Sequence, residues 1–147
     1  MHKKIMSLLR IGLGLIFAWA FFDKLFGLGF ATLPEKAWIA GGSPTYGFLA
    51  MASKGPFEGI FKAIAGNAVV DWLFMLGLLF VGVTLLLNRF VRWGSLAGLA
   101  MVVLMYLAVL PPENNPVLDD HIIYALVFLL LAHQAKTPVE QRPISNI

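Results

Sequence analysis

The sequence contains no cysteine, which excludes disulfide bonds, thiol redox chemistry and cysteine-ligated iron–sulfur clusters. Charged residues are scarce: eight acids and eleven bases make up 13% of the 147 residues, whereas hydrophobic residues make up 59%. A soluble domain of this size needs a polar shell over most of its surface, and so few charges cannot supply one. The composition therefore indicates a protein of the lipid bilayer, and the net charge of +3 does not call for a nucleic-acid partner.

Histidine is scarce as well, with three residues in the chain. His121 and His133 are twelve positions apart on one predicted helix, which separates them by about 18 Å at 1.5 Å per residue. They cannot ligate the same haem iron, and no other spacing typical of a metal site is present. We expect neither haem nor a protein-bound metal.

Apolar residues are gathered in blocks long enough to cross a hydrocarbon core of about 30 Å, which takes about 20 helical residues. The blocks predict an all-α, four-helix transmembrane bundle in a single membrane domain, residues 1–147. The predicted helices lie at about 7–30, 68–87, 93–110 and 116–133, the last beginning at the cap Asn115-Pro116, and a polar tail follows at 134–147. The first block also resembles a signal peptide, with a cleavage site near Ala18-Trp19-Ala20, but the apolar run continues past it and favours a retained anchor.

Between the first two predicted spans lies a segment of mixed character, at about 43–66. Ser43-Pro44 and Gly55-Pro56 are both typical helix starts. After the second start, apolar residues recur at helical spacing, and Glu58 and Lys62 form an i,i+4 pair off that stripe. We expect a short amphipathic helix on the extracytoplasmic side, lying on the bilayer or capping the bundle.

The distribution of bases predicts the orientation. With four spans, the side that holds both termini carries seven bases and one acid, while the other side carries four lysines and seven acids. Basic residues favour the cytoplasmic side. We therefore predict a multi-pass protein of the cell membrane with cytoplasmic N- and C-termini. The seven bases are Lys3, Lys4, Arg10, Arg89, Arg92, Lys136 and Arg142.

Several polar residues lie at the outer ends of the predicted spans. Asp23-Lys24 comes late in the first span, one turn after Trp19. Ionisable groups at membrane depth are costly and usually mark a site, but these two also fit the interface, with Lys24 reaching the headgroups. Both interpretations stay open. Asp71-Trp72 begins the second span at the same level.

Asp119-Asp120-His121 opens the fourth predicted helix, where acids complement the helix dipole without any further role. In the alternative interpretation, Asp120, His121 and Tyr124 form a proton-handling group. Helices of one bundle end at a common depth, so Asp23, Asp71 and Asp120 are predicted to form one cluster with Lys24 as counter-ion. Glycines such as those in Gly94-Ser-Leu-Ala-Gly98 permit close helix approach, within the bundle or in a homo-oligomer.

Together these segments resemble the DoxX family, including the DoxD-like subunit of thiosulfate:quinone oxidoreductase. The resemblance covers nearly the whole chain. It is carried by Arg10-Ile-Gly-Leu-Gly-Leu-Ile-Phe, Asp23-Lys-Leu25, Gly41-Gly-Ser-Pro-Thr-Tyr-Gly-Phe-Leu49, Lys54-Gly-Pro-Phe57, Ala65-Gly-Asn67, Asp71-Trp72 and Leu110-Pro-Pro-Glu-Asn-Asn-Pro-Val-Leu-Asp-Asp-His-Ile-Ile-Tyr124.

The resemblance implies a four-helix membrane protein and, for some members, electron transfer from thiosulfate to quinone with a partner subunit. A quinone site needs an apolar cleft, a few polar groups and a proton-transfer group. Trp19, Trp72, Tyr106 and Tyr124 are the predicted walls, and Asp23, Asp120 and His121 the predicted catalytic groups, with Lys24 and Asp71 beside them. The chain has no electron carrier of its own, so a partner would supply it.

Three functions remain open from the sequence. The first is a membrane subunit of a quinone-linked oxidoreductase. The second is a non-enzymatic module that anchors or organises partner proteins. The third, a small-solute transporter, is disfavoured because the chain shows no two similar halves with broken helices.

Overall fold

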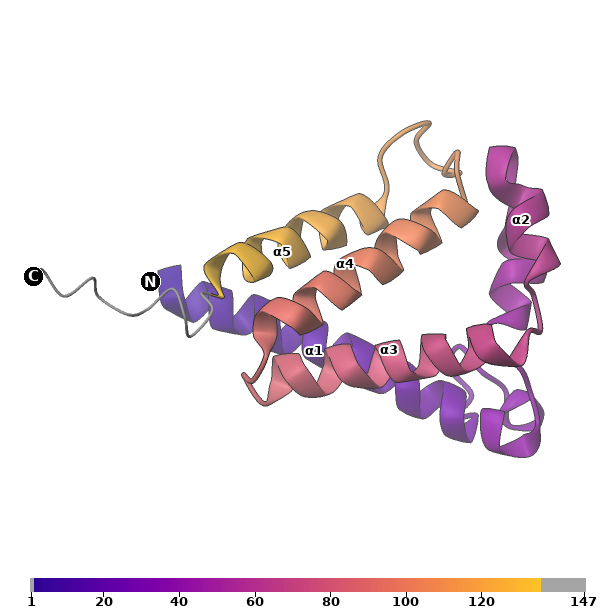
Figure 1. Cartoon of the computed structure of the whole chain (residues 1–147), viewed down its shortest axis with the longest axis horizontal. Helices are drawn as coiled ribbons and strands as arrows, with labels where there is room; N and C mark the ends of the chain where they lie inside the picture. The colour runs from indigo at the N-terminus through magenta and orange to yellow at the C-terminus, as the bar shows by residue number, and fades with distance from the viewer. Residues whose placement is uncertain (1, 136–147) are drawn as a thin grey trace, which may run out of the picture.

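The computed structural model of the chain describes residues 2–135, and this part is all-helical, without a strand. Three helices are long and apolar enough to cross a membrane: α1 (His2–Phe26), α3 (Ala68–Leu86) and α4 (Val91–Ala108). A shorter apolar helix, α5 (Asp120–Gln134), packs along α4. Helix α1 packs along α3, and α3 along α4 (Figure 1). Most of the predicted polar tail, from residue 136, lies outside the described residues.

Short helical pieces connect α1 to α3. They are η1 (Pro34–Lys36), η2 (Trp38–Ala40), the π-helical turn η3 (Phe48–Ala52), η4 (Gly55–Phe57) and α2 (Glu58–Ala63). Residues 43–66, which hold η3, η4 and α2, are called the roof below. Helix α2 lies across the open end between α3 and α4 (Figure 1).

Both predicted starts within the roof mark the beginning of helical structure. The hydroxyl of Ser43 accepts a hydrogen bond from the backbone N–H of Tyr46, where helical residues begin. Gly55 and Pro56 open η4, which continues directly into α2. The predicted i,i+4 pair is also present, with Lys62 Nζ 2.5 Å from Glu58 Oε1.

Three helix ends differ from the sequence prediction by four or five residues. Helix α1 begins at His2 and not near residue 7. Helix α1 ends at Phe26 and not near residue 30, because Gly27 adopts a left-handed backbone with φ of 64° and packs against the backbone of Pro34. Helix α5 begins at Asp120 and not at residue 116. The side chain of Asn115 forms a turn with the N–H groups of residues 117 and 118, and Asp119 caps the helix instead.

Small residues set the distance between helices. A Cβ atom on Gly94 would lie 1.9 Å from Thr84 Oγ1, and one on Gly98 would lie 2.4 Å from the ring of Phe128. The glycines of the Gly94–Gly98 pattern therefore pack α4 against α3 and α5 of the same chain, as the packing interpretation predicts. From this close contact α3 and α4 diverge toward the roof (Figure 1).

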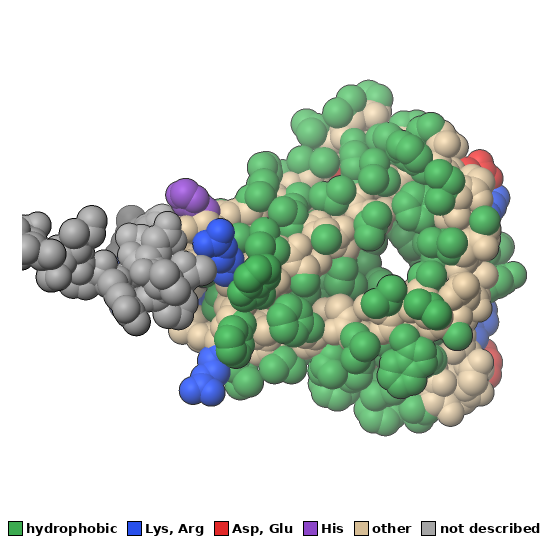
Figure 2. Space-filling view, viewed as in Figure 1, with side chains coloured by type: hydrophobic (Ala, Val, Ile, Leu, Met, Phe, Trp, Pro, Cys, Tyr) green, Lys and Arg blue, Asp and Glu red, His purple; other side chains and the backbone are tan. Residues whose placement is uncertain are grey.

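Charged side chains gather at the two ends of the apolar body (Figure 2). The described bases Lys3, Lys4, Arg89 and Arg92 lie at the end where α1 begins, and α3 and α4 are joined there. Arg10 also reaches this end of α3, where its guanidinium donates to the backbone carbonyls of Leu85 and Leu86. Acidic side chains lie at the opposite end, beside the roof (Figure 2).

Candidate functional site: an apolar cavity below the roof

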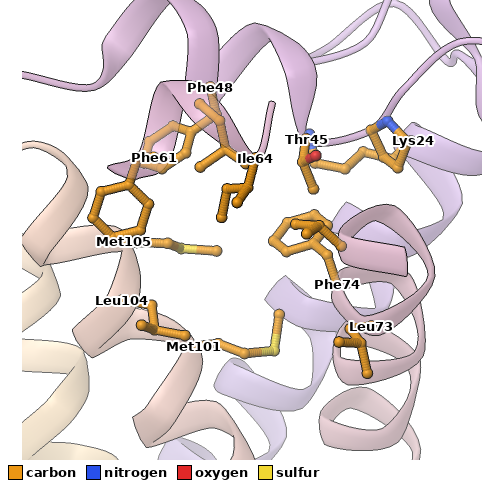
Figure 3. Close-up of a pocket in the computed structure, with 13 residues that line it drawn as sticks. Lys24, Thr45, Phe48, Phe61, Ile64, Leu73, Phe74, Met101, Leu104 and Met105 are labelled. Carbon is orange, nitrogen blue, oxygen red and sulfur yellow. The ribbon is translucent and has the colours of Figure 1, made fainter. Parts of the chain in front are cut away.

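A cavity of about 410 Å³ lies between the diverging ends of α3 and α4, below the roof. Helices α3 and α4 line it with residues at helical spacing, so one face of each helix points inward, and the roof and α1 complete the lining (Figure 3). Polar side chains contribute at two positions only. The lining residues are Val70, Leu73 and Phe74 of α3, Met101, Leu104 and Met105 of α4, Pro44, Thr45, Phe48, Leu49, Phe61 and Ile64 of the roof, and Lys24 of α1.

The polar end of the cavity is formed by Lys24 and Thr45, which lie near each other in Figure 3. The ion pairs of the described residues are Lys54–Glu113, Lys62–Glu58 and His121–Asp119, and none includes Lys24. The Lys24 ammonium lies 6.0 Å from the centroid of the Phe74 ring, at the outer limit of a cation–π contact. It is therefore a charged donor available to a ligand that presents an acceptor.

The predicted site residue Asp23 is buried, with 1% of its surface exposed. Its two carboxylate oxygens accept hydrogen bonds from the backbone N–H groups of Phe30, at 3.2 Å, and Ala31, at 3.0 Å. These bonds fasten the loop after α1 to the helix. The carboxylate thus serves the backbone of its own loop.

Asp71, another predicted site residue, is also buried, at 6% exposure. One of its carboxylate oxygens accepts three hydrogen bonds: from Ser43 Oγ at 2.9 Å, from Thr45 N at 3.2 Å and from Thr45 Oγ1 at 2.5 Å. Asp71 therefore holds the start of the roof on α3. Because the Thr45 hydroxyl donates to Asp71, its oxygen can only accept a bond from a ligand in the cavity.

The third predicted carboxylate, Asp120, lines a different cavity of about 520 Å³ between the end of α4 and the start of α5. His121 lies here too, and its Nδ1 is 2.7 Å from Asp119 Oδ2, so Asp119 and not Asp120 is the partner of the imidazole. Lys54 contributes an ion pair at 3.5 Å to Glu113. Within residues 2–135, no group of three or more His, Asp or Glu residues is arranged to hold a metal ion.

The structure does not bring the three predicted carboxylates to one site. No hydrogen bond or ion pair within residues 2–135 joins any two of Asp23, Asp71 and Asp120. The carboxylates of Asp23 and Asp71 bind separate segments of backbone. Among the predicted site residues, only Lys24 lines the apolar cavity.

The four predicted aromatic residues lie outside that cavity. The Trp19 ring packs edge-on against Phe30, with centroids 5.1 Å apart, and the Trp72 ring packs against Trp38 at 4.6 Å. The Tyr106 hydroxyl donates to a backbone carbonyl in the loop before α5, and Tyr124 is 36% exposed on α5.

Several cavity residues escaped the sequence prediction, although a signal for two of them existed. Phe61 and Ile64 belong to the apolar stripe predicted for the amphipathic segment, and the structure turns them toward the cavity. Met101 and Met105 carry no such signal, because an apolar residue on a transmembrane helix looks the same whether it faces lipid or a ligand.

No protein-family model, curated protein or solved structure matches this chain.

Proposed function

We propose that this chain is a DoxX-like subunit of a quinone-linked oxidoreductase in the cell membrane, and that the apolar cavity holds the quinone. The supporting observation is a cavity of about 410 Å³, apolar on all sides but one, with the ammonium of Lys24, which is in none of the described ion pairs, at its polar end. Sites for small ligands have this size and composition. A quinone presents carbonyl oxygens, which can accept a hydrogen bond from Lys24. Its apolar parts match the remaining walls.

The proposal includes four spans with cytoplasmic termini. Helix α5 has 15 residues and is about 22 Å long, less than the hydrocarbon thickness. Asp119 and Asp120 separate its apolar residues from the exposed Val117 and Leu118, so a span formed by α5 requires local thinning of the bilayer. The side chains of Leu126 and Leu129 are half exposed, as expected for a face in contact with lipid. The basic end of the body then faces the cytoplasm.

Electron transfer in this proposal needs a partner protein. The chain has no cysteine, and the donor would therefore bring its own redox group. The Asp119–His121 pair at the outer end is the described group best suited to exchange protons with water, because the carboxylate orients the imidazole. The substrate implied by the DoxX resemblance is thiosulfate, and the outer end of this chain is rich in acids, so the partner would bind that anion.

The proposal is tested by extracting purified protein with organic solvent and measuring quinone by mass spectrometry. Lys24→Met removes the donor while keeping the length of the side chain, and we expect about a tenfold loss of quinone affinity. Lys36→Met is the matched control, because Lys36 is exposed and does not line the cavity. Absence of quinone from the wild-type extract, together with no binding of added quinone, would refute the proposal.

A second candidate is the non-enzymatic anchoring module. It is favoured by one observation: the carboxylates of Asp23 and Asp71 are both occupied by backbone or hydroxyl donors and serve the fold. In that case the protein would bind no quinone, and co-purification with a partner from native membranes would survive Lys24→Met unchanged.

A further inference from the structure

The apolar cavity opens sideways between α3 and α4 (Figure 2). Leu73 of α3 and Leu104 of α4 both line it, yet their side chains are 67% and 55% exposed. A residue that touches both the cavity and the surroundings stands at its mouth. The space-filling view shows an opening, bordered by hydrophobic side chains, in the area that α3, α4 and α2 enclose (Figure 2). We call the gap between Leu73 and Leu104 the mouth.

The mouth lies at the level of lipid tails and not of water. Leu73 is five residues from the start of α3, and Leu104 is four residues from the end of α4. At 1.5 Å per residue, these positions are about 6–8 Å inside the outer ends of the helices. This depth corresponds to the hydrocarbon of the outer leaflet in the proposed orientation.

The two ends of the cavity along the helix axes are closed. Toward the cytoplasmic end, α3 and α4 touch at Gly77, where a Cβ atom would lie 2.7 Å from Met101 Sδ. Toward the outer water, the roof is held at its start and in its middle. Asp71 binds Thr45 at the start, and in the middle the backbone N–H of Lys54 donates to the carbonyl of Ala108 at 2.9 Å.

We infer that a long-chain quinone enters this cavity sideways from the outer leaflet, with its head at Lys24 and its tail leaving through the mouth between Leu73 and Leu104. This inference rests on the proposed function and names the ligand's route and chain class. The volume of about 410 Å³ is near the lower end for small-molecule sites, so the cavity encloses a head group and not a long isoprenoid chain. The remaining chain must stay in lipid, and the mouth opens there.

The test uses the full chain in lipid nanodiscs and two benzoquinones with the same head, one with a long isoprenoid tail and one with none. Leu73→Trp and Leu104→Trp fill the mouth. Leu76→Trp and Val103→Trp are matched controls, since both residues are comparably exposed on the same helices and neither lines the cavity. Equilibrium binding of each quinone is measured for every variant.

We expect the mouth variants to bind the long-tailed quinone about tenfold more weakly and to keep the affinity for the tail-free quinone within about twofold. The controls should bind both as the wild type does. Full binding of the long-tailed quinone by the mouth variants, or equal loss of both quinones, overturns the inference while quinone binding itself stands. If the wild type binds neither quinone, the proposed function fails first.

A second pair of variants covers the case in which the tryptophan variants do not fold. Leu73→Ala and Leu104→Ala widen the mouth without adding volume. They should raise the association rate of the long-tailed quinone by about threefold or more, with little change for the tail-free one. An unchanged association rate overturns the sideways route.

Discussion

Replacing Asp71 with alanine should release the roof from α3. One oxygen of this buried carboxylate accepts three hydrogen bonds, two of them from Thr45. The truncation leaves the N–H and the hydroxyl of Thr45, which is only 4% exposed, without an acceptor. Because the roof covers one end of the apolar cavity, this change also tests how the roof is held in place there.

The magnitude follows from the groups left unpaired. Each buried donor without a partner costs about 1–3 kcal/mol, so the two donors of Thr45 together cost about 2–6 kcal/mol. Removing a buried charge returns part of its desolvation cost, which offsets some of this loss. We expect Asp71→Ala to lower the free energy of unfolding by about 2–4 kcal/mol. Asp71→Asn keeps a neutral acceptor and should cost about half as much.

The assay is unfolding of the purified protein in mixed micelles, together with hydrogen exchange of the backbone over residues 43–52. Asp120→Ala is the matched control, because Asp120 is exposed in the first turn of α5 and should contribute about 0.3–1 kcal/mol through the helix dipole. Exchange over 43–52 should rise for Asp71→Ala and not for the control. Equal stability of the two variants, with unchanged exchange, would refute the role assigned to Asp71.

Three further changes test other parts of the fold. Gly94→Ala should lower the free energy of unfolding by about 1–3 kcal/mol, because the new Cβ overlaps a hydroxyl of α3. Gly12→Ala meets nothing within 4 Å and should be neutral, and thermal unfolding in detergent separates the two variants. Asp119→Ala removes the cap of α5 and the partner of His121, and should cost about 0.5–2 kcal/mol, with faster amide exchange in the first turn of α5; unchanged exchange would contradict it. Arg10→Met should destabilise the protein by about 1–3 kcal/mol, since the final carbonyls of α3 lose their charged donor. Arg10→Lys should recover part of that loss. Equal melting temperatures for the wild type and both variants would count against this contact.

The positions of α3 and α4 could be predicted from the sequence because apolar run length decides them. The ends of the other helices were harder to predict, and single residues show why. Asn115-Pro116 has the composition of a helix cap, but the same asparagine forms a turn with residues 117 and 118 equally well. Local composition does not distinguish the two outcomes, and the true cap, Asp119, has the same chemistry.

The candidate site was predictable only in part. Their positions near the ends of the predicted spans suggested one level for Lys24, Asp23 and Asp71. The sequence could not show that both carboxylates accept hydrogen bonds from the segment between α1 and α3. The cavity depends on how far two helices diverge. That divergence follows from close contacts such as the one at Gly94, whose partner on α3 is known only from the fold.

Arg10 lies eight residues after the start of α1, about 12 Å along the helix, and its guanidinium reaches the end of α3. During synthesis α1 leaves the ribosome well before the carbonyls of Leu85 and Leu86 exist. This contact between the two helices can therefore form only after α3 has been made, so Arg10 joins them late in assembly.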